Sequence, residues 1–353
     1  MKTKVAAVVL SSLITFFLVE ALYRIYLRLS GAAGPLVGPL NLTEPVVLEP
    51  DAELGWKNKA GKYEFLYGAG GKKYPVVVNV GQSGERLHAL SVSGEREKAD
   101  KAEVAVIGCS FTFGWGVSDD DTFTARLARE YPQFHFVNLA CGGYSTYQAL
   151  LSLERRYRTR PPPRFVIYGF PAFHAERNVA SVQWQYVLFV FSKRGHAQVP
   201  YVTLGTDGRL QRHPPEGFAY PPFFASSKVL SRYYLWIQSK RDRRREGERR
   251  VTEALLLALQ EWAEARGAKL IVAVLDRDKY AQYEAFLQSH AISYARATPH
   301  YASLPYDDHP DWHFHRDVAE QLGQRLRALI AESGAGSPFA HGDIPPGADV
   351  PHE

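Results

Sequence analysis

The chain has 353 residues, of which 46% are hydrophobic and 22% are charged. This composition is that of a globular protein, and it excludes disorder for the bulk of the chain because enough apolar surface is present to offset the ordering entropy. The formal net charge of +5 is too small to indicate a nucleic-acid partner, and we expect none. The chain has neither a zinc-type Cys/His spacing nor a Gly-rich phosphate loop, so we expect no metal and no other cofactor.

Residues 1–29 predict a membrane helix. Lys2 and Lys4 precede an apolar run over 5–19, and the helical pattern then continues to Leu29 past Glu20 and Arg24. We prefer an uncleaved signal anchor, with a cleaved signal peptide and a buried core helix as alternatives. The two lysines favour a cytoplasmic N-terminus. The protein would then be membrane-anchored, with the rest of the chain periplasmic or extracellular.

The remaining chain divides by composition into a linker, one domain and a tail. Residues 30–50 are rich in Gly, Pro and Leu and are typical of a linker, and residues 51–332 form the candidate domain. The Gly/Pro-rich residues 333–353 predict a disordered tail. Residues 54–86 predict short strands and turns, with a β run over 74–80.

A repeated strand–helix pattern then predicts the fold class. Buried strands without polar alternation are typical of parallel sheets. The fold class is therefore α/β, a three-layer α/β/α sandwich with a mostly parallel sheet of the flavodoxin-like kind. The predicted strands are 103–107, 134–139, 164–170 and 269–275, and the predicted helices are 122–130, 147–157, 226–266 with a break near Gly247, 279–290 and 316–332.

Residues 179–224 interrupt this rhythm and predict an insertion. Within it, residues 202–210 have the pattern of a β-hairpin whose turn is Asp207-Gly208. We expect this insertion to line one side of the functional site.

Candidate catalytic residues follow the strand ends, because reactive groups of open parallel sheets collect at the carboxyl edge. Ser110 comes directly after a buried strand. A serine needs a base and a group that orients the base, and the segment 306–315 supplies histidines and aspartates for both roles. The Ser110 N–H and the glycines at 142 and 143 are natural donors to an oxyanion.

Three segments resemble the conserved blocks of the SGNH/GDSL hydrolase family. Residues 106–117 are similar to the first block, with Cys109 in place of the usual Asp, and residues 138–148 are similar to the second. Residues 307–311 are similar to the final block. The resemblance implies a nucleophile at Ser110, a base at His309, an orienting Asp307 with Asp308 as second candidate, and an oxyanion donor at Gly143.

The third block of the family is altered in this chain. The family has an Asn that donates to the oxyanion, and here Pro171 stands at that position and has no N–H. The nearest side-chain donors are His174 and Asn178. We hypothesise that His174 substitutes for the missing donor; the alternative is that His174 faces a solvated loop.

The resemblance implies a serine hydrolase that cleaves carboxylic esters, carried by a small molecule or a polysaccharide, through an acyl-enzyme on Ser110. One alternative is an O-acyltransferase or deacetylase acting on an envelope polysaccharide. Another is a catalytically inactive module that binds carbohydrate or lipid. A metal site at His313 and His315 is disfavoured because no fitting Cys or Glu accompanies them. Cys109 and Cys141 can form either a disulfide or two buried thiols.

Overall fold

The computed structural model describes residues 2–29, 47–69, 72–92, 101–191, 197–218, 220–221, 226–275, 280–297 and 310–334. A five-stranded parallel sheet forms its centre, in the order β11-β10-β7-β5-β6. The strands are β5 (Ala102–Ile107), β6 (Phe134–Asn138), β7 (Phe165–Phe170), β10 (Lys269–Val274) and β11 (Tyr294–Arg296). Numbered by their own sequence, they have the order 2-1-3-4-5 of a flavodoxin-like sheet, which confirms the predicted fold class.

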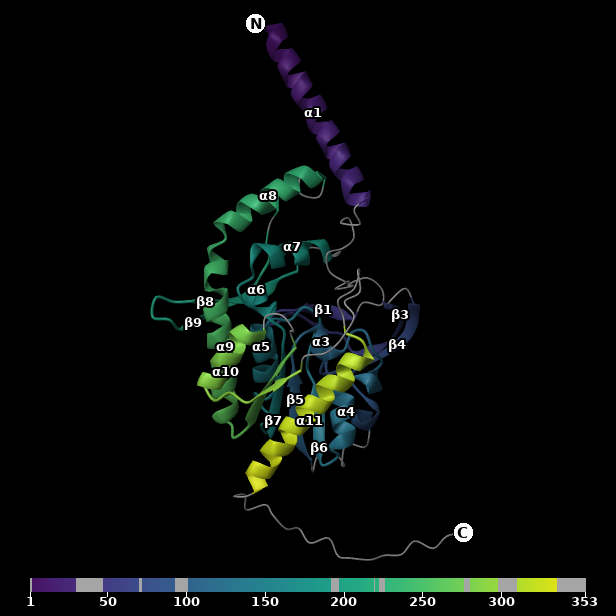
Figure 1. Ribbon diagram of the computed structural model, residues 1–353, viewed down its shortest axis with the longest axis vertical. Coiled ribbons are helices and arrows are strands. Elements are labelled where there is room, and N and C mark those ends of the chain that lie inside the picture. Colours follow the sequence, from purple (N-terminus) through teal and green to yellow (C-terminus); the bar gives the residue numbers. More distant parts are fainter. Residues whose placement is uncertain are drawn as a thin grey trace, which may run out of the picture.

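Helices cover both faces of this sheet (Figure 1). On one face α4 (Phe123–Glu130) packs against α11 (Trp312–Gly334), and their side chains share one apolar cluster with β5 and β7. The other face carries α5 (Thr146–Arg156), α9 (Glu248–Glu264) and α10 (Tyr280–Ser289) around a second cluster. A Ser145–Gln148 capping box begins α5.

Residues before the sheet form two antiparallel strand pairs. The first is β1 (Leu48–Asp51) with β2 (Gly55–Asn58), and the second is β3 (Gly61–Ala69) with β4 (Lys72–Val80). The predicted β run at 74–80 lies inside β4. The predicted linker is three residues too long, because β1 begins at Leu48. Residues 30–46 and 335–353, which hold the rest of the linker and nearly all of the tail, lie outside the described residues.

The insertion contains more helix than the sequence indicated. It follows α6 (His174–Asn178) and holds α7 (Val182–Phe191) besides the expected hairpin of β8 (Val199–Leu204) and β9 (Leu210–Glu216). The hairpin packs on α5 and α9, where Arg212 forms an ion pair with Glu154 at 2.8 Å. The predicted helix 226–266 is divided, as expected near Gly247, into α8 (Lys228–Arg241) and α9.

Helix α1 (Lys2–Leu29) projects away from the domain (Figure 1). Its segment Lys4–Leu29 is long and apolar enough to cross a membrane, and only 6% of its most apolar window is buried. The alternative of a buried core helix is therefore wrong.

Candidate active site

A sharp turn at the end of β5 presents Ser110. Gly108 has a φ of +151°, and a Cβ at this position would lie 2.3 Å from Thr112 Oγ1 and 3.0 Å from the Gly169 carbonyl oxygen. Only glycine therefore allows the chain to pass from β5 into the short helix α3 (Ser110–Phe113). Ser110 is the first residue of that helix. It also lies where strand order reverses between β5 and β7, which is where open α/β sheets bind ligands.

The loop after β6 is joined directly to this turn. Its Leu139 N–H donates to the Val106 carbonyl at 2.8 Å, and its Cys141 N–H donates to the Gly108 carbonyl at 3.2 Å. This pairing brings Ser110 and Gly143 to the same edge of the sheet. In the part of the chain that the structure describes, neither of these two residues donates its backbone N–H to another group. Both amides are thus available to a developing oxyanion.

The first turn of α11 packs against the segment that follows Ser110. The rings of Phe111 and Phe314 meet edge to face at a centroid distance of 6.1 Å. The Pro310 carbonyl oxygen lies so close to Gly116 that a Cβ there would be 2.9 Å from it. The Asp311 carboxylate caps α11 by accepting from the backbone N–H groups of residues 313 and 314 at 3.0 and 3.2 Å. The predicted His309, Asp307 and Asp308 lie outside the described residues.

His174 is fully buried, so it does not face a solvated loop. Its Nδ1 lies 2.7 Å from the Tyr168 hydroxyl, which lies 2.7 Å from the Thr146 hydroxyl. The His174 Nε2 is buried with no hydrogen-bond partner among the described residues. Burial, followed by the charge of Arg177, lowers the pKa of His174 well below its usual value, so the ring is neutral.

Asn178 is engaged elsewhere. Its side-chain N–H groups donate to Thr146 at 3.1 Å and to Thr252 at 3.0 Å, and its Oδ1 accepts from the Tyr147 N–H at 3.2 Å. Both amide hydrogens are therefore used in joining α5, α6 and α9. No amide hydrogen of Asn178 remains for an oxyanion in this arrangement.

Cys109 and Cys141 are free thiols in this structure and form no disulfide with each other. Both are buried, and burial raises the pKa of each thiol above its usual value. They are therefore protonated and unreactive at neutral pH.

Arg86 is a residue of the site region that sequence reasoning missed. Its guanidinium is buried and donates to the Asp119 carboxylate at 2.9 Å, to the Phe113 carbonyl at 2.8 Å and to the Val117 carbonyl at 2.6 Å. It also donates to the Gly114 carbonyl. These contacts fix the shape of the loop that follows Ser110. No local pattern in the sequence indicates this pair, because Arg86 and Asp119 are 33 residues apart.

The histidines of α11 do not form a metal centre with described residues. The His315 Nδ1 accepts from the Phe123 N–H at 3.3 Å, and burial, followed by the charges of Arg86 and Arg126, lowers the pKa of His315 to about 3. No group of three His, Cys, Asp or Glu side chains suited to a metal is found within the described ranges.

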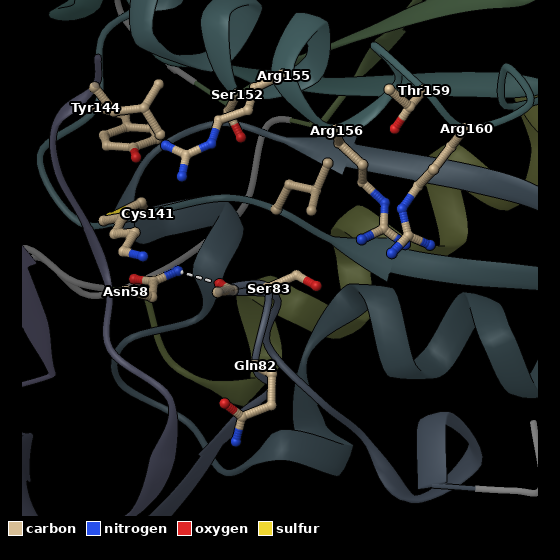
Figure 2. Close-up of a pocket in the computed structure, with 14 residues that line it drawn as sticks. Asn58, Gln82, Ser83, Cys141, Tyr144, Ser152, Arg155, Arg156, Thr159 and Arg160 are labelled. Atoms are coloured by element: carbon tan, nitrogen blue, oxygen red, sulfur yellow. Dashed lines mark hydrogen bonds between the residues drawn. The ribbon is translucent and has the colours of Figure 1, made fainter. Parts of the chain in front are cut away.

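A separate polar cavity of about 280 Å³ lies beyond the loop after β6 (Figure 2). Cys141 and Tyr144 line it, whereas Ser110 does not. Two arginines that line the cavity already form ion pairs, Arg155 with Asp51 at 2.7 Å and Arg156 with Glu103 at 3.1 Å. We therefore assign the cavity no part in the chemistry at Ser110.

The chain matches no known family model and no curated protein. Among solved structures it is similar to a GDSL-like lipase from Bacteroides thetaiotaomicron, with 14% identity, 67% of this chain and 91% of that chain covered, and a TM-score of 0.34. It is also similar to a carbohydrate acetylesterase from Sinorhizobium meliloti, with 10% identity, coverages of 65% and 100%, and a TM-score of 0.36. Identities and TM-scores this low assign no activity.

Proposed function

We propose that this chain is a membrane-anchored serine hydrolase of the SGNH type that cleaves carboxylic esters. Ser110 is the nucleophile, His309 its base and Asp307 the residue that orients the base. The observation that carries the proposal is the packing of the first turn of α11 against the segment after Ser110, through Phe111 and Phe314. The chain directly after the proposed base is thereby held beside the proposed nucleophile.

The chemistry follows from these assignments. His309 takes the Ser110 hydroxyl proton as the Ser110 oxygen attacks the ester carbonyl. The tetrahedral oxyanion accepts hydrogen bonds from the free N–H groups of Ser110 and Gly143. Collapse breaks the ester C–O bond, and His309 returns the proton to the leaving alkoxide. Water, or the hydroxyl of an acceptor sugar, then releases the acyl group by the same steps in reverse.

A fluorophosphonate probe tests the nucleophile on the full chain in detergent. We expect covalent labelling at Ser110, mapped by mass spectrometry, that is lost in Ser110→Ala and His309→Ala. Ser118→Ala is the matched control, because Ser118 lies in the same loop outside the proposed site and should leave labelling unchanged. A folded chain without labelling at Ser110 would favour the inactive binding module.

His174 is the proposed third oxyanion donor. Donation from Nε2 requires that Nδ1 accept the Tyr168 hydroxyl hydrogen, with the Thr146 hydroxyl pointing to the Tyr168 oxygen. In the structure the Tyr168 hydroxyl donates to the Thr146 oxygen at 2.7 Å, so its hydrogen must turn toward the His174 Nδ1, also 2.7 Å away, for this donation.

For the His174→Ala variant we expect kcat to fall about 100-fold, with KM little changed, because a donor to the transition state is lost. His174→Gln keeps an N–H donor and should retain more activity. Turnover of a model ester, measured with both variants at matched thermal stability, checks this. Unchanged turnover in His174→Ala would exclude the assignment.

The contacts of α1 with the domain support an uncleaved anchor. The Glu20 carboxylate accepts from the backbone N–H groups of Lys228 and Val229 at 2.9 and 3.0 Å, and from the Ser227 hydroxyl at 2.9 Å. A cleaved signal peptide would leave the first turn of α8 without these acceptors. Intact mass of the protein purified from membranes tests retention, and a mature N-terminus beyond residue 29 would contradict it.

A further inference from the structure

Helix α8 carries an exposed surface of aromatic and basic side chains. Tyr233 and Trp236 are 59% and 58% exposed, and their rings stack at a centroid distance of 6.1 Å. Arg232 and Lys240 are exposed on the same side of the helix, because positions 232, 233, 236 and 240 fall on one face at 3.6 residues per turn. We refer to these four residues as the aromatic–basic face.

The opposite side of α8 is the one that packs on the protein. Ser231 and Leu235 are buried, and α8 contacts α7. In Figure 1, α7 lies between α8 and the sheet, and α1 leaves the molecule on the far side of α8. The aromatic–basic face thus lies on the side of α8 away from the buried Ser231 and Leu235.

A polar joint fixes α8 to α1. Besides its three bonds from the first turn of α8, Glu20 accepts from the Arg24 guanidinium at 2.7 Å, and Arg24 donates to the Ser226 carbonyl at 2.7 Å. Glu20 is only 8% exposed, although most of α1 is exposed. The start of α8 is therefore held at one level along α1.

The length and polarity of α1 suit a joint at the boundary of a bilayer. The helix rises about 24 Å from Lys4 to Glu20 at about 1.5 Å per residue, and the hydrocarbon core of a bilayer is about 30 Å thick. A joint containing Glu20 and Arg24 is stable among lipid headgroups and costly in the hydrocarbon. Tyr and Trp prefer the same headgroup level, and Arg and Lys are attracted there by anionic lipids.

We propose that α8 is a second membrane contact, whose aromatic–basic face lies among anionic phospholipid headgroups of the bilayer that α1 spans. The inference rests on the anchoring part of the proposed function and is independent of the ester chemistry. It gives the domain a fixed orientation on the membrane, since two elements contact the bilayer instead of one.

Depth-dependent quenching tests this on the full chain in nanodiscs of phosphatidylcholine with phosphatidylglycerol. A fluorophore sensitive to polarity is attached to the single-site variants Trp236→Cys, Leu13→Cys and Arg209→Cys. Leu13 lies in the middle of the apolar run of α1, and Arg209, whose side chain is 88% exposed, lies in the distant hairpin turn. The unmodified chain supplies the background, because Cys109 and Cys141 are buried.

We expect the label at 236 to be quenched at least twofold more by lipids with a shallow spin label than by lipids with a deep one. The label at 13 should show the reverse order, and the label at 209 no quenching. A label at 236 that behaves like the one at 209, while 13 is quenched, overturns the inference and leaves the anchor intact. An unquenched label at 13 overturns both the anchor and the α8 contact. Probe labelling of Ser110 would still test the proposed ester hydrolysis independently.

Lipid charge gives a second measurement. Replacing phosphatidylglycerol by phosphatidylcholine should reduce quenching at 236 at least twofold, and Arg232→Gln with Lys240→Gln should reproduce that loss in the anionic nanodisc. Equal quenching in both lipid mixtures would overturn the preference for anionic headgroups.

Discussion

A single buried guanidinium organises the loop that follows the proposed nucleophile. Arg86 reaches this loop from the segment after β4, and its own backbone N–H donates to the Asn138 carbonyl at 2.8 Å. One residue thus connects the edge strand β6, the acidic residues before α4 and the nucleophile loop. Its removal would take a charged donor from the Asp119 carboxylate, which would still accept from Asn79, and would remove the guanidinium donor from the Phe113 and Val117 carbonyls.

We therefore expect Arg86→Met to lower the free energy of unfolding by about 3 kcal/mol or more, because it breaks a buried pair. Arg158→Met is the control, since Arg158 pairs with Glu53 where the side chains are 63% and 38% exposed. That change should cost less than about 1 kcal/mol. Urea unfolding followed by tryptophan fluorescence measures both, and equal effects would contradict the role given to Arg86.

His315 makes stability depend on pH. Its pKa of about 3 in the folded chain lies below the ordinary value of 6.5, so the unfolded chain binds a proton that the folded chain does not. Stability from the neutral ring is complete above pH 6.5 and is lost as pH falls toward 3. Between pH 6.5 and 5 the loss is about 2 kcal/mol for a group buried to this degree.

We expect the melting temperature to fall between pH 7 and 5, and to fall less in His315→Gln, which keeps polar atoms but does not titrate. His290→Gln, at an exposed position, is the control and should follow the wild type. A variant at 315 with an unchanged pH dependence would refute this explanation.

At the scale of elements, the turn from β5 into α3 depends on Gly108. The Gly108→Ala change combines an unfavourable positive φ with a clash against Thr112, whose Oγ1 would be 2.3 Å from the new Cβ. We expect it to destabilise the fold by about 2–4 kcal/mol and to abolish probe labelling of Ser110.

The Gly208→Ala change separates the cost of a positive φ from the cost of the steric clash. Gly208 has a φ of +76°, and a Cβ added there would have no other atom within 4 Å, so only the backbone cost of about 1 kcal/mol should remain. Thermal unfolding of both variants measures the difference. A Gly108→Ala chain that is no less stable than Gly208→Ala would rule out the steric argument.

The elements that the sequence predicted well are those with a strong local pattern. The strand over 102–107 is apolar and buried from Val104 onward, the strand over 165–170 is buried throughout, and the hairpin has an Asp-Gly turn between its strands. Helix α7 was missed because Val182–Phe191 is apolar almost throughout and shows no helical periodicity. Strand β11 was missed because Tyr294–Arg296 is three residues long and is stabilised by its pairing with β10.

At the scale of the whole molecule, the position of Ser110 and Gly143 at one edge of the sheet followed from the rule that functional groups gather at the carboxyl edge of parallel strands. The position of His174 did not follow, because its burial depends on aromatic rings of β7 and α6 that only the tertiary fold brings together. Burial of Asn178 in a network with Thr146 and Thr252 was hidden for the same reason.

In the proposed membrane-anchored arrangement, the joint at Glu20 also sets the membrane thickness that suits the protein. With both ends of the apolar stretch fixed, at Lys4 and at the joint, only about 24 Å of helix is available to match the hydrocarbon core. A thicker bilayer must thin around α1 or pull Glu20 from the first turn of α8, and either response costs free energy. Hydrophobic mismatch would therefore favour residence in thin bilayers, through a contact between two helices and not through any sorting sequence.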